Sequence, residues 1–406
     1  MATSFQLLAP DAPAAYHQHQ RLDAACHQLD APVAVLDLHA LSANANALVR
    51  RADGKPIRIA SKSIRCVAVL RALLATEGFS GVLAFNLAEA IMLVETGVTD
   101  DVVVAYPTVA RQALRRLLAS EQLLGAVTLM IDHPDQLRLI RQLGPPSASV
   151  RVCLDMDMSL RLGTLHIGAR RSPIHTAEQL TAAAEFVADT NGFRLVGLMG
   201  YEAQIAGVTD DTPLNRTVKR ISQAELRARR GQLVAAARLV LAQRGLPDLE
   251  FVNAGGTGSL GSTSADEAVT EVAAGSGIYG PHLFDRYDDF TVHPAAFFGL
   301  DVTRHPAPGI ITVQGGGWIA SGPPGPDRLP LPVYPPGLSY TRTEGAGEVQ
   351  TPLLASITDR PAIGQRIWFR HTKAGELAEH VTHFHLITNQ RITATLTTYR
   401  GDGLAL

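Results

Sequence analysis

Residues 58–106 read RIASKSIRCVAVLRALLATEGFSGVLAFNLAEAIMLVETGVTDDVVVAY, and they contain three short apolar runs separated by two longer segments. The runs RIAS, GVLAFN and DVVVAY are rich in β-branched and other apolar residues, which is typical of buried strands. The two segments between them have helical spacing and close on glycine, as helices often do. Strands that alternate with helices in this way predict a parallel α/β sheet.

The same alternation continues well beyond residue 106. Five more strands are expected, in the runs AVTLMID from residue 126, SVRVCLDMD from 149, FRLVGLMGY from 193, LEFVNAGG from 249 and TEVAAGSG from 270. Helical segments lie between most of them. Eight strands in alternation with helices predict an α/β fold of the (β/α)8 TIM-barrel type over residues 40–290. A ninth candidate strand, VAVLDL from residue 33, is assigned to a separate layer.

The character of the chain changes after about residue 290. Glycine and proline become frequent, and the strand candidates GIITVQG, RIWFRH, VTHFHLI and RITATLTTYR follow one another without long helices between them. This pattern predicts a second, mostly β domain. We expect residues 1–39 and 291–406 to form it together.

Composition excludes several classes of protein. The 406 residues carry a formal charge of −2 and 46% hydrophobic side chains, and the acidic and basic residues are interspersed, so no nucleic-acid partner is expected. No run has the length of a membrane span and the first residues lack the pattern of a signal peptide, which predicts a cytoplasmic protein with no membrane partner. Cys26, Cys66 and Cys153 form no CxxC pair and are interpreted as buried apolar residues.

The chemistry of a barrel enzyme is expected at the carboxyl ends of the strands. Lys62 ends the first predicted strand. A lysine that is desolvated there can lose its proton near neutral pH and form a Schiff base. The alternative is a lysine at the rim that points into water.

Two glycine clusters follow the last two predicted barrel strands. NAGGTGS spans residues 253–259 and AAGSGIYG spans residues 273–280, where barrels commonly bind a phosphate with backbone N–H groups. Thr257, Ser259 and Tyr279 are candidate hydroxyl donors. Either cluster alone is also compatible with a tight turn. Together with Lys62 they predict a phosphate-bearing aldehyde cofactor, and pyridoxal phosphate meets that description.

These segments, in this order, resemble the alanine-racemase-like barrel enzymes that use pyridoxal phosphate. The resemblance is carried by PVAVLDLHALSANANAL, RIASKSIR, DMDMSLRLG, GLMGYEAQ, VNAGGTGS and TEVAAGSGIYG. Within these enzymes the chain is similar to the branch of D-threonine aldolase and D-serine dehydratase. GARRSP, GEVQTP, HTKAGELAEH and TYRGDG resemble amino acid deaminase/aldolase sequences of that branch.

The resemblance implies that Lys62 is the Schiff-base lysine and acts as a base on one face of the cofactor. It also implies a set of cofactor-binding residues around the ring and phosphate: Lys62, Arg161, Tyr201, Gln204, Gly256, Thr257, Gly258, Gly275, Ser276, Gly277 and Tyr279. Arg161 in SLRLG would end the fifth barrel strand and lie near the phenolic oxygen or the substrate carboxylate, although a structural ion pair is an equal alternative. Tyr201 as a core residue is the alternative to a place beside the ring.

The chain also departs from the branch in two places. The branch has R-P-H-x-K around its lysine, whereas Ala60 stands here where the histidine would be. The branch binds a divalent metal through a His-x-Cys or His-x-Asp pair, and here His371 is kept while Lys373 replaces the second ligand. A protonated lysine cannot ligate and repels a cation. No divalent metal is therefore expected.

We hypothesise that the Lys373 ammonium supplies the positive charge instead, and that it orients the substrate's β-hydroxyl or carboxylate. His371 and Lys373 then join Lys62 as catalytic residues, and Glu376 and Glu379 tune Lys373 or act in acid–base steps. The alternative is that Lys373 and both glutamates form a solvated helix start. His380, His383 and His385 cluster as a second place for a metal, but histidines on a half-exposed strand are commoner than a metal site.

The resulting prediction is a pyridoxal phosphate-dependent lyase for a small substrate, a β-hydroxy D-amino acid, acting by retro-aldol cleavage or dehydrative deamination. The alternatives are an amino acid racemase and a non-catalytic pyridoxal phosphate-binding protein. A racemase needs a second base across the ring from Lys62, for which Tyr340 and the C-terminal histidines are candidates. The resemblance further implies a homodimer.

Overall fold

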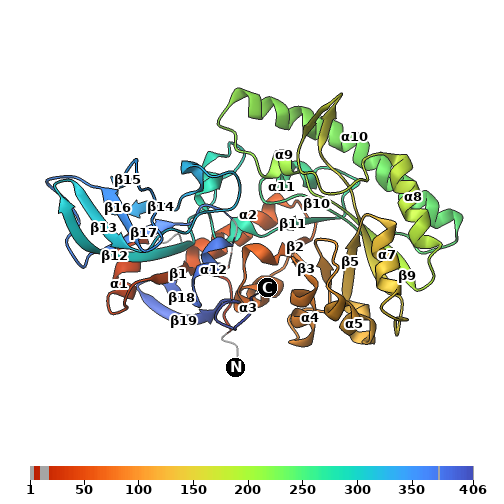
Figure 1. Ribbon diagram of the computed structural model, residues 1–406, viewed down its shortest axis with the longest axis horizontal. Coiled ribbons are helices and arrows are strands. Elements are labelled where there is room, and N and C mark those ends of the chain that lie inside the picture. The colour runs from red at the N-terminus through yellow and green to blue at the C-terminus, as the bar shows by residue number, and fades with distance from the viewer. Residues whose placement is uncertain (1–3, 10–17, 374, 406) are drawn as a thin grey trace. The chain divides into compact units, whose positions relative to one another are not determined.

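Figure 1 shows the computed structural model of the protein, which describes residues 4–9, 18–373 and 375–405. The chain forms two compact units. The barrel unit comprises residues 48–62 and 74–275, and the β-rich unit comprises residues 63–73, residues 276–405 and the described residues up to 47. The domain limits at residues 40 and 290 remain a prediction, from which these units differ in the segments 40–47, 63–73 and 276–290.

The barrel unit contains a closed barrel of eight parallel strands, as predicted. All eight are the strands expected from the sequence: β2 (Ile57–Ala60), β3 (Phe79–Ala84), β4 (Val102–Val104), β5 (Val127–Ile131), β6 (Val150–Asp155), β9 (Phe193–Gly200), β10 (Phe251–Ala254) and β11 (Glu271–Ala274). Their order around the barrel is β10-β11-β2-β3-β4-β5-β6-β9. Three strands therefore separate β2 from β6 in either direction, so that these two strands lie opposite each other.

The barrel interior is filled by side chains. A buried apolar cluster draws on every strand except β2, with Ala60 of β2 packed against it: Leu83, Val103, Ala105, Met130, Cys153, Val196, Met199, Phe251 and Ala273. Arg58 is buried beside the Phe251 ring and makes two hydrogen bonds to Glu271, of 2.6 and 2.9 Å, and one of 2.8 Å to Asp101. These bonds connect β2 to β11 and to the start of β4, and they fix the strand that leads to Lys62.

Helices connect most of the barrel strands. They are α4 (Leu87–Glu95), α5 (Arg111–Leu118), α6 (Glu121–Ala126), α7 (Pro134–Arg141), α8 (Ala177–Ala188), α9 (Ala203–Ala206), α10 (Pro213–Gln243) and α11 (Leu260–Ser264). The longest of the described helices, α10, begins at Pro213. Thr212 caps it by accepting a hydrogen bond from the Asn215 N–H, and proline is favourable at the first helical position.

A short hairpin between β6 and α8 is absent from the sequence-based prediction. Its strands are β7 (Leu160–Leu162) and β8 (Leu165–Ile167), which pair antiparallel. Gly163 adopts a φ of +59° in the turn, a conformation that favours glycine. Three-residue strands with two-residue turns carry too little periodicity to be read from the sequence.

The β-rich unit is built around a nine-stranded sheet, as predicted. Its strands are β1 (Val33–Asp37), β12 (Ala296–Ala307), β13 (Ile310–Gln314), β14 (Leu331–Tyr334), β15 (Ser339–Tyr340), β16 (Gln350–Leu354), β17 (Arg366–Arg370), β18 (His383–Thr388) and β19 (Arg391–Thr397). The order is β15-β16-β13-β12-β1-β18-β19, and β17 pairs with β12 and β14. β1 is the strand that the sequence assigns to a separate layer, and it lies between β12 and β18.

Few helices accompany this sheet. α1 (Gln18–Cys26), α3 (Val67–Leu74) and α12 (Glu376–His380) are assigned mainly or wholly to this unit, and α2 (Leu38–Arg51) is divided between both units. Short 3-10 turns complete the chain at η1 (Ser61–Ser63), η2 (Ser276–Ile278), η3 (His282–Arg286) and η4 (Pro326–Arg328).

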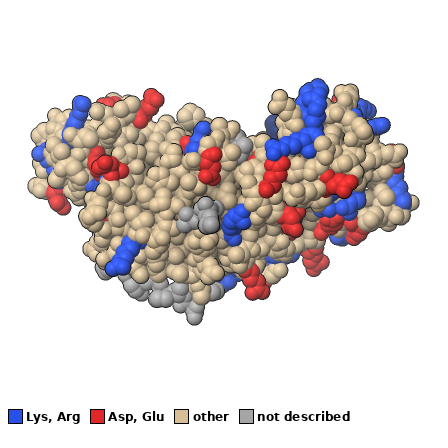
Figure 2. Space-filling view, turned by 90° about the horizontal axis from the view of Figure 1, so that it is seen from below, with Lys and Arg blue, Asp and Glu red and all other residues tan. Residues whose placement is uncertain are grey.

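Surface and cysteine features agree with the sequence-based expectations. Cys26, Cys66 and Cys153 are all free and buried. Figure 2 shows acidic and basic side chains next to one another on one face of the molecule, in line with the interspersed charges of the sequence. Within the described residues, no helix combines the length and the apolar character that crossing a membrane requires.

Candidate functional site

Lys62 lies at the carboxyl end of β2, in the 3-10 turn η1 that follows Ala60. The Ser61 hydroxyl donates to the Leu83 carbonyl at 3.1 Å and holds this turn against β3. Lys62 itself is exposed, and its Nζ donates to the hydroxyl of Tyr106 at 3.4 Å. The expectation of a desolvated lysine on the strand is therefore corrected, because the turn carries the side chain beyond the buried strand. The rim position matches the alternative that the sequence left open.

Two tyrosines and one arginine border the mouth of the barrel. Tyr106 follows β4, and Tyr201 directly follows β9. The Arg171 guanidinium lies 5.6 Å from the ring centre of Tyr106 and 5.5 Å from that of Tyr201. Both distances suit cation–π contacts. Burial raises the pKa of the Tyr201 hydroxyl to about 12, so this hydroxyl keeps its proton at neutral pH.

Two aspartates, one at the end of β6 and one just beyond it, have pKa values that are shifted in opposite directions. Burial, reinforced by Asp132 and partly offset by Arg171, raises the pKa of Asp155 to about 7. Burial also acts on Asp157, but hydrogen bonds from the Ser159 N–H and hydroxyl and the ion pair with Arg161 outweigh it and lower its pKa. Environments that separate the pKa values of neighbouring carboxyls are a signature of acid–base sites.

The glycine clusters contain two positions where a side chain would collide with neighbouring residues. A Cβ on Gly275 would lie 2.5 Å from the Ala60 carbonyl oxygen, so only glycine fits where β11 ends beside β2. A Cβ on Gly256 would lie 3.2 Å from both the Tyr201 ring and the Ala206 side chain. Both glycines are therefore positions of close packing against neighbouring residues. They lie at the carboxyl ends of barrel strands, where backbone N–H groups commonly bind a phosphate. Ser276 and Gly277 directly follow Gly275 in η2, and Thr257 and Gly258 directly follow Gly256.

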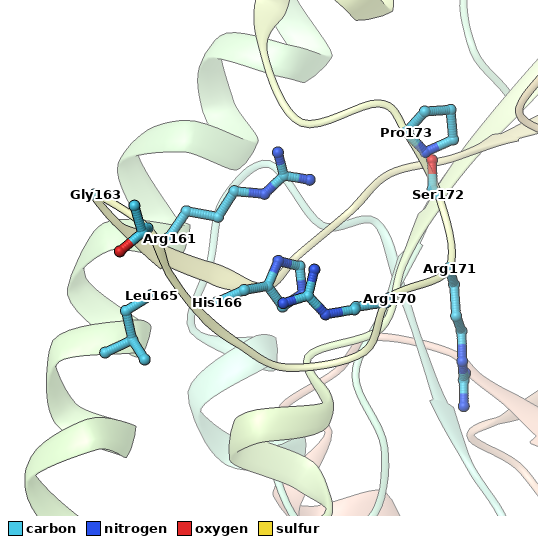
Figure 3. Close-up of a pocket in the computed structure, with 9 residues that line it drawn as sticks. Arg161, Gly163, Leu165, His166, Arg170, Arg171, Ser172 and Pro173 are labelled. Carbon is cyan, nitrogen blue, oxygen red and sulfur yellow. The ribbon is translucent and has the colours of Figure 1, made fainter.

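Arg161 does not end a barrel strand as predicted. It lies on β7 of the hairpin and forms an ion pair with Asp157, which corresponds to the ion-pair alternative. A pocket of about 400 Å³ adjoins the hairpin and is lined by Arg161, Gly163, Thr164, Leu165, His166, Arg170, Arg171, Ser172 and Pro173. Figure 3 shows Arg161 and His166 extending from the hairpin and Arg170 and Arg171 from the loop after it, with Arg171 pointing away from the other two arginines. The charge of this lining suits anionic ligands.

Two further residues of the predicted cofactor set have structural contacts. The Gln204 side chain is buried and donates to the Met158 carbonyl at 2.7 Å, so it fixes the segment between β6 and the hairpin. Tyr279 is completely buried and donates its hydroxyl hydrogen to the Ile64 carbonyl at 2.8 Å. Burial raises the pKa of Tyr279 well above its ordinary value. In this structure the Tyr279 hydroxyl hydrogen is thus already used, and the role of Tyr279 as a phosphate donor stays a prediction.

The β-rich unit holds the two other predicted catalytic residues. His371 directly follows β17 and is buried beside Tyr279, with ring centres 6.4 Å apart. The Lys373 N–H donates to the Glu376 carboxylate at 2.6 Å. Burial raises the pKa of Glu376 to about 7. Glu376 is thus not part of a solvated helix start, whereas Glu379 forms ion pairs with Arg65 and Arg400.

The remaining candidate residues are the C-terminal histidines and Tyr340. His383 and His385 are neighbours on β18 with ring centres 4.8 Å apart, and His380 stacks on Trp318. Among the described residues, no group of three or more His, Cys, Asp or Glu side chains is arranged to hold a metal ion. Tyr340 donates its hydroxyl to the Pro330 carbonyl at 2.6 Å, and burial raises its pKa above the ordinary value.

Three residues at the barrel mouth were missed by the sequence analysis, namely Tyr106, Asp155 and Arg171. A signal existed for two of them, because Tyr106 closes the run DVVVAY and Asp155 lies in SVRVCLDMD, both at the ends of predicted barrel strands. Arg171 lies in a loop, and its contact with two rings depends on the path of that loop. No pattern in the sequence specifies this path.

The Alanine racemase, N-terminal domain family model matches residues 36–282, which is more than half of the chain. The protein therefore belongs to this family of fold-type III pyridoxal phosphate-dependent enzymes. No curated protein matches the chain by sequence comparison.

Solved structures similar to this chain include three instructive examples. D-threonine aldolase from Filomicrobium marinum is 22% identical, with 93% of this chain and 96% of that chain covered and a TM-score of 0.77. D-threo-3-hydroxyaspartate dehydratase from Delftia sp. HT23 is 23% identical, with 92% and 98% covered and a TM-score of 0.72. Alanine racemase from Clostridium difficile 630 is 12% identical, with 90% and 97% covered and a TM-score of 0.59. These likenesses establish the shared fold.

Proposed function

We propose that this protein is a lyase that uses pyridoxal phosphate to act on a β-hydroxy D-amino acid, by retro-aldol cleavage or by dehydrative deamination. The observation that carries the proposal is the barrel mouth, where Lys62 follows β2 and Gly275 follows the adjacent strand β11. The likeness to a D-threonine aldolase and a D-threo-3-hydroxyaspartate dehydratase over more than 90% of both chains supports lyase chemistry. A homodimer and a cytoplasmic location are parts of the same proposal.

The residues at the mouth fit the cofactor. Lys62 offers an exposed amine, and Gly256 and Gly275 offer main chain that no Cβ covers. β10, β11 and β2 are consecutive around the barrel. One cofactor molecule would therefore reach the glycines with its phosphate and Lys62 with its aldehyde. When bound, pyridoxal phosphate supplies an aldehyde for the amine and a conjugated ring that accepts the electron pair released at Cα.

Different residues of the chain would then take different roles in the reaction. Lys62 holds the cofactor and exchanges the proton at Cα, and the Tyr106 hydroxyl orients the Lys62 Nζ through their 3.4 Å hydrogen bond. Tyr201 borders Gly256 and keeps its phenolic proton because of its raised pKa. Arg171 holds both rings in place and adds a positive charge that suits the substrate carboxylate.

Racemisation is the second candidate function. It requires a base on each side of Cα, and Asp155 ends β6, the strand opposite β2. The family to which the chain belongs takes its name from alanine racemase.

Product analysis tests these functions. The purified protein with pyridoxal phosphate is incubated with D- and L-threonine, D- and L-serine, D- and L-alanine and the stereoisomers of 3-hydroxyaspartate. Glycine with an aldehyde indicates cleavage, ammonia with a 2-oxo acid indicates dehydration, and the mirror-image amino acid indicates racemisation. The lyase proposal expects one of the first two outcomes with D substrates. Racemisation of alanine without lysis, or no reaction at all, would contradict it.

Lys373 and metal ions give a separate expected result. If the Lys373 ammonium replaces a metal, Lys373→Met lowers kcat for the β-hydroxy substrate by about 10²-fold, in the range for loss of one electrostatic stabiliser. Lys373→Arg, which keeps the charge, retains more of the activity. Prolonged treatment of the wild type with EDTA leaves its rate unchanged. Loss of the rate under EDTA with recovery in Mn²⁺, together with an unaffected Lys373→Met variant, would refute the idea.

A further inference from the structure

The carboxylate of Asp155 is the one acidic group at the barrel mouth that the described structure leaves without a hydrogen bond or an ion pair. Its backbone is fixed, because the Ser172 hydroxyl donates to the Asp155 carbonyl at 2.6 Å. Asp132, at the end of β5, accepts a hydrogen bond from Gln136 at 2.7 Å. Asp157 is held by Ser159 and Arg161. Asp155 therefore has a fixed position and a carboxylate available to a ligand.

The position of Asp155 is defined by the strand order. It is the last residue of β6, which lies opposite β2 in the ring of eight strands, and Lys62 follows β2. Arg171 reaches Tyr106, after β4, and Tyr201, after β9, and so spans the side of the mouth where β5 and β6 end. A ligand attached at Lys62 and extending across the mouth meets Asp155 on the far side.

We propose that Asp155 is the acid–base group that exchanges a proton with the β-hydroxyl of the substrate, while Lys62 serves Cα. This inference rests on the proposed lyase function. In cleavage, the β-hydroxyl gives its proton to the Asp155 carboxylate, its oxygen forms the aldehyde C=O, the Cα–Cβ bond breaks with its electron pair left at Cα, and Lys62 returns a proton to Cα. In dehydration, Lys62 takes the Cα proton, and the Asp155 carboxyl gives its proton to the departing hydroxyl, which leaves with the C–O electron pair as water.

The electrostatics of Asp155 suit this role. The charged groups that face it are Asp132 from the end of β5, Asp157 from beyond its own strand and Arg171 from the loop after the hairpin. Burial and the two aspartates raise its pKa to about 7, against the opposing effect of Arg171. A group with that pKa both holds and releases a proton at neutral pH, which is the optimum for general acid–base catalysis. Tyr201, with a pKa of about 12, is far less suited to this exchange.

The test distinguishes proton transfer at the β-hydroxyl from proton transfer at Cα. Asp155→Asn is compared with the wild type on the β-hydroxy amino acid that the wild type consumes, and on alanine of the same configuration, which lacks a β-hydroxyl. The expected result is a fall in kcat of about 10²–10⁴-fold for the β-hydroxy substrate. The rate at which the alanine Cα hydrogen exchanges in D2O changes less than about 3-fold, because the loss of a general acid or base slows only the proton transfer that this group carries out. Asp100→Asn is the matched control, since Asp100 is exposed and lies before β4, at the other end of the barrel.

A second measurement does not depend on turnover. Between about pH 4 and pH 7 the folded protein holds a proton on Asp155 that the unfolded chain has released, so the wild type loses stability as the pH rises through this window and levels off above it. Asparagine cannot ionise. The unfolding midpoint of full-length Asp155→Asn, relative to wild type, therefore rises between pH 4 and pH 7, and that of Asp100→Asn does not.

Several outcomes overturn the proposal. Unchanged cleavage by Asp155→Asn excludes a role in proton transfer, and an equal loss of alanine exchange assigns Asp155 to Cα instead. A stability difference that does not vary with pH shows that Asp155 carries no proton near neutrality. If the wild type itself consumes no β-hydroxy amino acid, the lyase function fails together with this inference, whereas an active wild type with an active Asp155→Asn variant refutes the inference alone.

Discussion

Lys62→Ala is expected to lower turnover by about 10⁴-fold or more, in the range measured when a covalent catalytic group is removed. The variant also loses the visible absorption that bound pyridoxal phosphate gives the wild type. The physical reason is that the amine of Lys62 is both the attachment point of the cofactor and the proton carrier at Cα. Tyr106 then has no amine to orient.

The chain makes this experiment unusually decisive, because it contains only four lysines, Lys55, Lys62, Lys219 and Lys373. Borohydride reduction of the wild type followed by peptide mapping is expected to find the cofactor on Lys62 alone. Lys62→Arg keeps the charge but remains inactive, and Lys55→Arg keeps both the cofactor and the rate. A reduced cofactor found on Lys373 or Lys219 would reject the assignment of Lys62.

Arg230→Met is expected to destabilise the barrel unit by about 3–5 kcal/mol, the usual cost of removing one partner from a buried ion pair. Arg230, on α10, donates to Asp266 at 2.5 Å and to Glu202 at 2.6 Å, and all three side chains are at most 4% exposed. Glu202 also accepts the Thr263 hydroxyl at 3.0 Å. Without Arg230, Glu202 and Asp266 remain buried and lose the ion-pair partner that they share.

The effect of this change extends to the site, because Glu202 follows Tyr201 directly and the loop between β9 and α9 depends on its contacts. Thermal or urea unfolding measures the loss. Arg244→Met is the control, since Arg244 pairs with the exposed Asp189, and exposed pairs of this kind contribute little to stability. The triple variant Arg230→Met with Glu202→Gln and Asp266→Asn removes all three charges and recovers part of the stability. Equal losses for Arg230→Met and Arg244→Met would contradict the argument.

The barrel could be predicted from the sequence because its strands are buried on both faces. Val102–Val104 is wholly apolar and Val127–Ile131 is apolar except for Thr128, and this pattern is independent of how distant segments pack. Lys62 and the glycines of both clusters follow from the rule that barrel sites lie at strand ends. These features are determined locally.

The rest of the site depends on loops. Arg161 was assigned to a strand end because SLRLG follows a predicted strand closely, yet β6 already ends at Asp155 and the chain turns into the hairpin. Arg171 contacts two rings only because that loop returns over the barrel mouth. The raised pKa of Asp155 results from burial and from Asp132 on the neighbouring strand. Contacts between residues that are far apart in the chain leave no pattern in the local sequence.

The place of β1 in the sheet has a consequence for synthesis of the chain on the ribosome. Asp37 of β1 pairs with Ile387 of β18, so 350 residues must be translated before these neighbours meet. At about 5–20 residues per second this takes on the order of 20–70 s. All five residues of β1 are buried in the finished sheet, and its partners β12 and β18 begin only at Ala296 and His383. The nascent protein therefore carries an unprotected apolar strand through most of its elongation, and its dependence on chaperones should be greatest in that interval.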